Sequence, residues 1–253
     1  MLIRSRAPLR LGLAGGGTDL PVFCDPNTGF ILNATVDMYV HCTILVEGTG
    51  KISFNSENFD LSSICDSELS LSLDGTLDLY KAVYNRIVAD YVKTPLSFTL
   101  TTFSEAPPGS GLGGSSTLVV AMIKAYSEWL DLALGVYDIA RLAYQIERID
   151  LGLTGGQQDQ YAATFGGFNF MEFSENKHVV VNPLGLKNWI VSELEACCFM
   201  GFSGVSRDSS TIIDNQVSGV EVSNSIVTES LFKLKEDALE MKKSLLKGDM
   251  LGV

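Results

Sequence analysis

Apolar and polar positions alternate in several short stretches of the first hundred residues, and this period of two predicts β-strands. The strands are expected at residues 2–10, 30–36, 39–46, 51–55 and 96–103. Other segments repeat their apolar side chains every three or four residues, which predicts amphipathic helices at 77–92, within 104–134 and at 137–149. A short helix followed by a hairpin of two strands, at 168–173 and 178–182, is expected next.

The pattern changes near residues 183–187, and we expect a domain boundary there that divides the chain into residues 1–185 and 186–253. The second part predicts a strand at 194–202 and a long amphipathic helix at 223–247. Strands and helices mix without strict alternation, which favours the α+β class over a doubly wound sheet. A domain of about 65 residues with one strand and one helix buries too little surface to be complete, so we expect it to be completed by something else or to be truncated.

The composition indicates a globular protein with a substantial core, because 46% of the residues are hydrophobic and 19% are charged. A net charge of −12 argues against nucleic acid or an anionic membrane as a partner. No apolar run approaches the roughly 20 residues of a membrane-spanning helix, and the N-terminus lacks the hydrophobic region of a signal peptide. The five cysteines show no C-x-x-C spacing, so we expect reduced thiols in a cytoplasmic protein.

A glycine-rich stretch, PPGSGLGGSST at 107–117, directly precedes a predicted helix. Glycines let a loop approach an anion closely, and the free N–H groups and dipole at a helix N-terminus favour phosphate. The hydroxyls of Ser115 and Ser116 can cap the helix or ligate a metal. The stretch has neither the Gly-Lys-Ser/Thr of a Walker A loop nor the third glycine of a dinucleotide fingerprint. A flexible loop before an ordinary helix cap remains the alternative.

A second glycine cluster, LGLAGGGTDL at 11–20, ends in Asp19 and follows two arginines, Arg6 and Arg10. An arginine near a transferring phosphoryl group can stabilise developing charge, and an aspartate on a glycine loop can accept hydrogen bonds from sugar hydroxyls. The alternative is an arginine at a strand edge and an aspartate in a turn, both of which are common.

Two carboxylates, Glu147 and Asp159, lie on either side of a third glycine-containing loop. One carboxylate can help to hold Mg²⁺, and the other can accept a proton from an attacking hydroxyl or orient it. Asp150 is an alternative metal ligand. Glu147 and Asp150 can equally be solvated charges at a helix end, beside Arg148.

The three clusters together resemble the motifs of the GHMP kinase superfamily, which includes galactokinase and the homoserine, mevalonate and phosphomevalonate kinases. APLRLGLAGGGTDL resembles the first motif, and PPGSGLGGSST resembles the second, the nucleotide-phosphate loop. Within the superfamily, AGGGTDLP, IERIDLG and GGQQDQYAATFGGFNFMEF are similar to the branch of D-glycero-D-manno-heptose 7-phosphate kinases. The resemblance implies an N-terminal domain like ribosomal protein S5 domain 2 and a ferredoxin-like C-terminal domain. This second domain would be incomplete here, because the third family motif is missing.

The resemblance also implies roles for individual residues. Asp159 would be the base and Arg10 the cation near the transferred phosphoryl group, while Ser115 and Glu147 would hold Mg²⁺. ATP would bind over the second motif, namely Pro108, Gly109, Ser110, Gly111, Leu112, Gly113, Gly114, Ser115 and Ser116. The sugar would contact Gly16, Gly17, Thr18 and Asp19, and Arg6 and Arg207 are candidate donors to its phosphate.

The function implied is transfer of the ATP γ-phosphoryl group to the anomeric hydroxyl of D-glycero-D-manno-heptose 7-phosphate, which gives the 1,7-bisphosphate for nucleotide-heptose synthesis. The alternatives are another sugar-1-kinase, such as a fucokinase-like enzyme, or a chain that binds ATP without turnover. The expected partners are therefore ATP, Mg²⁺ and a small sugar phosphate, and a homodimer is left open.

Overall fold

The computed structural model describes residues 1–202, 204, 209–221 and 225–252. Within these residues, seven strands form one sheet in the order β4-β3-β5-β2-β6-β7, with β1 paired to β2. Only the β3–β5 pair is parallel among the pairs described. The strands are β1 (Leu2–Ala14), β2 (Gly29–Val46), β3 (Lys51–Ser56), β4 (Leu61–Asp66), β5 (Phe98–Ser104), β6 (Phe168–Ser174) and β7 (His178–Pro183).

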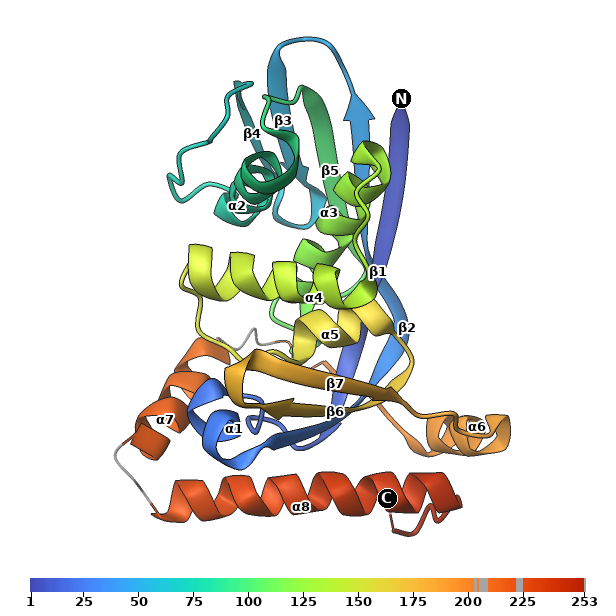
Figure 1. Cartoon of the computed structure of the whole chain (residues 1–253). Helices are drawn as coiled ribbons and strands as arrows, with labels where there is room; N and C mark the ends of the chain where they lie inside the picture. Colours follow the sequence, from blue (N-terminus) through green and yellow to red (C-terminus); the bar gives the residue numbers. More distant parts are fainter. Residues whose placement is uncertain (203, 205–208, 222–224, 253) are drawn as a thin grey trace.

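The helices cover this sheet and one end of the molecule (Figure 1). They are α1 (Pro21–Asn27), α2 (Asp78–Ile87), α3 (Gly114–Leu130), α4 (Val136–Tyr144), α5 (Gln158–Phe165), α6 (Asn188–Cys197), α7 (Ser209–Glu221) and α8 (Ser225–Lys247). Two π-helical turns, η2 (Val88–Val92) and η3 (Gln145–Asp150), extend α2 and α4. The mixture of one sheet with flanking helices confirms the α+β class. No helix in the described ranges has both the length and the apolar character needed to cross a membrane.

One long strand, β2, replaces the two strands predicted at 30–36 and 39–46. It pairs with β1 along most of its length, while its other edge pairs with β6 at residues 29–34 and with β5 at residues 40–46. A register shift in β1 between Pro8 and Arg10 lies opposite the predicted break. Such irregularities bend a strand without ending it, so β2 can serve two halves of the sheet.

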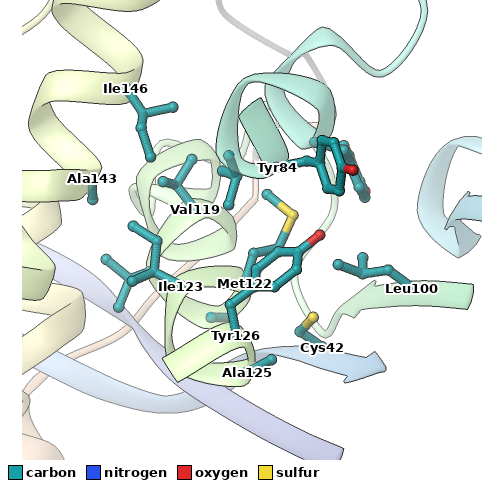
Figure 2. Packing of buried hydrophobic residues seen from close by; sticks show 14 of the residues in the cluster. Cys42, Tyr84, Leu100, Val119, Met122, Ile123, Ala125, Tyr126, Ala143 and Ile146 are labelled. Atoms are coloured by element: carbon teal, nitrogen blue, oxygen red, sulfur yellow. The ribbon is translucent and has the colours of Figure 1, made fainter. Parts of the chain in front are cut away.

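The core is organised around α3, which packs against β1 and β2. Its residues Val119, Met122, Ile123 and Tyr126 are fully buried, together with apolar side chains of α2 and β5. Figure 2 shows these side chains converging on one another. Because α3 is apolar over most of its circumference, it is fixed between the sheet and α2, and its N-terminus is held at a defined place.

The predicted strand at 194–202 is wrong, because α6 extends to Cys197 and residues 198–202 form no regular element. Ile190 and Leu194 are the buried side chains of α6, and their four-residue spacing is helical. Within the described residues, this segment pairs with no strand of the sheet. The predicted long helix is confirmed as α8 (Figure 1). Its Ala238 and Leu245 lie in one hydrophobic cluster with Ile190 and Leu194 of α6. The domain boundary near residue 185 stays a prediction.

Removing the side chain of Ile123 should destabilise the protein strongly, because this residue is 0% exposed in the centre of the core. We expect Ile123→Ala to lower the free energy of unfolding by about 2–5 kcal/mol. Ile64, which is 70% exposed on β4, offers the matched control, and Ile64→Ala should cost less than about 1 kcal/mol. Urea titrations of the two variants measure both values, and equal losses would contradict this description of the core.

Candidate active site

A cavity of about 670 Å³ opens where the end of β1 meets the loop before α3. Its walls come from Arg10–Gly16 of β1 and the following turn, from Ala106–Leu112 except Pro108 and Gly109, and from Gln158 at the start of α5. Met200, Phe202 and Leu234 close the far side. The structure therefore brings the first two glycine clusters of the sequence to one cavity.

The N-terminus of α3 faces this region without a side-chain cap. Gly109, Gly111 and Gly113 have φ values of 73°, 76° and 74°, in the left-handed region that favours glycine. The described hydrogen bonds of the first turn begin with the N–H of Thr117, which bonds the carbonyl of Gly113. The preceding N–H groups are thus free to bind an anion, which favours the phosphate-loop hypothesis over an ordinary helix cap.

Arg10 and Asp159 form an ion pair beside this loop. The Arg10 Nε lies 2.6 Å from Asp159 Oδ1, and Arg10 Nη1 donates to the carbonyl of Gly111 at 2.7 Å. A Cβ atom on Gly113 would lie 3.3 Å from both Arg10 and Asp159, so the pair is packed directly against the start of α3. Burial alone would lower the pKa of Arg10, but Asp159 and Asp19 outweigh it and raise that pKa.

Asp19 is buried beneath this pair and does not face the cavity. Its Oδ2 accepts the backbone N–H groups of Gln157 and Gln158, at 2.7 and 2.9 Å, and so satisfies the N-terminus of α5. A Cβ on Gly156 would lie only 2.0 Å from the same oxygen, so glycine is required there. Burial raises the pKa of Asp19, against the backbone hydrogen bonds that lower it. Its assignment to sugar binding stays a prediction.

The other predicted sugar contacts, Gly16, Gly17 and Thr18, differ in whether they are buried in the protein or line the cavity. Thr18 is fully buried, and its Oγ1 donates to the carbonyl of Phe30 at 2.8 Å and accepts the N–H of Phe30 at 3.0 Å. Gly17 has a φ of 90° and lies against Gln216 of α7, whereas Gly16 lines the cavity. Thr18 therefore anchors the turn, and of the four predicted sugar contacts at 16–19, Gly16 is the one that lines the cavity.

Glu147 lies in η3 and is 0% exposed. Its Oε1 accepts a hydrogen bond from Ser115 Oγ at 3.1 Å, which joins the two residues assigned to the metal. Burial raises the pKa of Glu147, although Arg148 and three hydrogen bonds oppose the shift. The alternative ligand Asp150 is held elsewhere, in an ion pair with Arg86 of α2.

Arg6, one of the two arginines assigned to the sugar phosphate, is not brought to this cavity. The guanidinium carbon of Arg6 lies 4.2 Å above the ring of Tyr39, on the exposed part of β1, and Arg6 does not line the cavity. Arg207 lies outside the described residues. The donors for a sugar phosphate thus remain a prediction at this point.

Sequence reasoning missed the three glutamines that flank Asp159, two before it and one after it. Gln158 lines the cavity beside Arg10, and its Nε2 lies 3.4 Å from Asp19 Oδ1. Gln160 is buried and donates to Glu147 Oε2 at 2.6 Å, while Gln157 is buried at the start of α5. A glutamine side chain is neither charged nor nucleophilic and therefore does not point to a site by itself. The position of these glutamines next to Asp159, in GGQQDQY, was the one available signal.

Replacing Asp19 by Asn should change how stability depends on pH. A carboxyl group with a raised pKa in the folded state stabilises the fold below its ordinary titration near pH 4 and loses that contribution as the pH rises. The amide oxygen of Asn can still accept the two N–H groups. We therefore expect Asp19→Asn to gain stability relative to the wild type between pH 4 and pH 8, measured by urea unfolding. Asp37→Asn, at an exposed position of β2, controls for the change of net charge. If the free energy of unfolding depends on pH in the same way for Asp19→Asn and the wild type, Asp19 does not contribute to the pH dependence of stability.

Comparison with known proteins places this arrangement in a family. A family model described as the N-terminal domain of GHMP kinases matches residues 78–167. A D-glycero-alpha-D-manno-heptose 7-phosphate kinase from Campylobacter jejuni is 54% identical over 249 residues, which cover 98% of this chain and 72% of that protein.

Solved structures agree with this match. A D-glycero-D-manno-heptose 1-phosphate kinase from Bacteroides thetaiotaomicron superposes with a TM-score of 0.84 at 47% identity, over 98% of this chain and 74% of that one. A sugar kinase from Campylobacter jejuni gives a TM-score of 0.76 at 50% identity, over 98% and 71% of the two chains. Because a heptose 7-phosphate kinase is 54% identical over 98% of this chain, and because the first two glycine clusters meet at one cavity beside the Arg10–Asp159 pair, the chain belongs to the GHMP kinases.

Proposed function

We propose that this kinase transfers the γ-phosphoryl group of ATP to the anomeric hydroxyl of D-glycero-D-manno-heptose 7-phosphate. The observation that carries the proposal is the Arg10–Asp159 ion pair packed against Gly113, at the start of an uncapped helix. A curated relative that is 54% identical is named a kinase of this sugar phosphate. Phosphoryl transfer depends on positioning and charge stabilisation, and both are available from these residues.

The loop at 107–113 would bind the phosphates of ATP. The free N–H groups at the start of α3 donate hydrogen bonds, and the dipole of this helix, which runs to Leu130, adds positive potential at the same end. The protein has a net charge of −12, so this attraction must come from local donors and not from the overall field.

Ser115 and Glu147 fit a magnesium ion by their chemistry. Their oxygens lie 3.1 Å apart, and Mg²⁺ prefers oxygen ligands, usually with only one or two carboxylates. Nowhere in the described residues do three His, Cys, Asp or Glu side chains gather into a metal cluster, and a site shared with phosphate oxygens does not require one. When bound there, Mg²⁺ would offset the negative charge of the phosphates.

Asp159 would accept a hydrogen bond from the attacking hydroxyl and take its proton. The carboxylate is 22% exposed, so a hydroxyl can reach it, and Arg10, which lines the cavity, fixes its Oδ1 by direct contact. The Arg10 guanidinium, held in place by the Gly111 carbonyl, would then lie where charge develops on the transferred group.

The sugar would occupy the cavity beside Gly16 and Gln158. The volume of this cavity is ordinary for a small-molecule site. Arg207 remains the proposed donor to the sugar phosphate, with Arg6 as the second candidate. We also propose a cytoplasmic location, where ATP and reduced thiols occur, because all five cysteines are free.

ADP release in the presence of Mg-ATP tests the substrate. We expect turnover with D-glycero-D-manno-heptose 7-phosphate and at least tenfold lower kcat/KM with the unphosphorylated heptose or L-fucose, because a missing phosphate leaves its donors unpaired. The heptose 1-phosphate should be inert, since its anomeric hydroxyl is blocked. Equal turnover of phosphorylated and unphosphorylated sugars would replace this proposal with the broader sugar-1-kinase.

Asp159→Asn tests the proton acceptor. The amide cannot take a proton, so kcat should fall by about 10²- to 10⁴-fold while the dissociation constant for ATP changes by less than about threefold. Asp131, an exposed residue at the end of α3, provides the matched control, and Asp131→Asn should leave both quantities unchanged. A wild-type rate in Asp159→Asn would remove this residue from the reaction.

A further inference from the structure

The side chain of Gln160 connects three elements of the candidate site. Gln160 is 0% exposed, and its Nε2 donates to Glu147 Oε2 at 2.6 Å and to Ser116 Oγ at 3.0 Å. Glu147 belongs to η3, Ser116 to the first turn of α3, and Gln160 to α5. One buried amide therefore ties the phosphate loop to the carboxylate beside it.

The orientation of this amide follows from its neighbours. Both hydrogens of Nε2 have an acceptor, whereas Gln160 Oε1 has no hydrogen-bond partner among the described residues. Turning the amide over would place Oε1 against the carboxylate of Glu147, oxygen against oxygen. The observed orientation keeps the donor Nε2 on Glu147 and leaves the acceptor Oε1 unpaired. An unpaired buried acceptor costs free energy of folding.

Among the described residues, the other polar groups that contact the Glu147 carboxylate are one arginine and two serines. The nearest cation is Arg148, whose Nη1 is 4.0 Å from Glu147 Oε1, a distance too long for a hydrogen bond. Ser115 and Ser116 also hydrogen-bond Glu147. Ser115 is itself exposed, and Ser116 is the second acceptor of Gln160 Nε2. The bond from Gln160 to Oε2, at 2.6 Å, is therefore a short, fully buried contact that helps to fix which oxygen of Glu147 points toward Ser115.

Gln160 can serve as a fixed reference because α5 is held at both ends. Asp19 binds the N–H groups at its start, and Lys124 Nζ of α3 lies 3.4 and 3.5 Å from the carbonyls of Ala163 and Thr164 at its end. The residue before Gln160 is Asp159, which pairs with Arg10 on another side of the same helix. One short helix therefore carries both the proposed proton acceptor and the support of Glu147.

We propose that Gln160 is a positioning residue that presets Glu147 for the metal ion accompanying ATP. By holding Oε2, it directs Oε1 toward the Ser115 hydroxyl, so that two oxygen ligands are in place before the nucleotide arrives. Hydrogen-bonded groups behind a ligating carboxylate commonly have this effect on metal affinity. The inference rests on the proposed function, in which Ser115 and Glu147 hold Mg²⁺.

Binding of a non-hydrolysable ATP analogue, measured by calorimetry with Mg²⁺ and again with a chelator, tests this without relying on turnover. Gln160→Met keeps the length of the side chain and loses the donor, and Gln160→Asn keeps the amide but cannot reach Glu147. Both should lose about 10- to 100-fold of the affinity measured with Mg²⁺ and stay within about twofold of the wild type in chelator.

Thr164→Val is the matched control, because it removes another buried hydrogen bond within α5, from Thr164 Oγ1 to the carbonyl of Gln160 at 2.7 Å. It should lower the thermal midpoint as the Gln160 variants do, yet keep the wild-type dependence on Mg²⁺. An unchanged Mg²⁺ dependence in both Gln160 variants, or an equal loss in Thr164→Val, overturns the positioning role alone. If Mg²⁺ does not tighten binding to the wild type, the metal site of the proposed function fails as well.

Discussion

The carboxylate of Asp19 accepts the N–H groups of Gln157 and Gln158, which lie 138 and 139 residues further along the chain. This contact joins two glycine-containing loops. It satisfies the start of α5 from inside the protein, where water cannot do so. Because α5 has only eight residues, its direction depends on how its first turn is held. Asp159 on this helix then meets Arg10 of β1, and Gln160 meets Glu147 of η3.

The core makes the second half of the site rigid. The burial of α3 along its apolar length, seen in Figure 2, leaves its N-terminal turn at the edge of the core with its N–H groups unpaired. Arg10 links this turn to β1 twice, through its backbone N–H to the carbonyl of Leu112 at 3.1 Å and through its side chain to Gly111. Donors for an anion and a pair of opposite charges are therefore held in place by packing, which is the arrangement that phosphoryl transfer requires.

Strong local patterns in the sequence were sufficient to predict most of the sheet and the main helices. The alternation at 96–103 became β5, and the periodicity at 223–247 became α8. The strand expected at 194–202 failed because a short apolar run does not distinguish the two periods, and the burial of Ile190 and Leu194 follows the helical one. The helix α1, with Pro26 inside it, and the largely exposed strand β4 carried too weak a pattern to be predicted.

The site divides in the same way. The glycine loop has a recognisable local sequence. The resemblance to a family assigned Ser115 and Glu147 to one metal ion, and Arg10 and Asp159 to the phosphoryl transfer. The structure brings each of these two pairs into contact. The buried contacts of Asp19 and Gln160 could not be predicted, because they depend on partners that only the tertiary fold brings near. A sequence shows which residues can do chemistry, whereas the residues that hold them in place look like ordinary polar positions.

The central claim is that the Arg10–Asp159 pair and the start of α3 together surround the transferred phosphoryl group. A crystal structure of the protein with Mg²⁺ and a non-hydrolysable ATP analogue tests this most directly. We expect the triphosphate over residues 109–114, the cation between Ser115 and Glu147, and the terminal phosphate facing Arg10 and Asp159. A triphosphate bound away from this loop, or a terminal phosphate that points away from the pair, would contradict it.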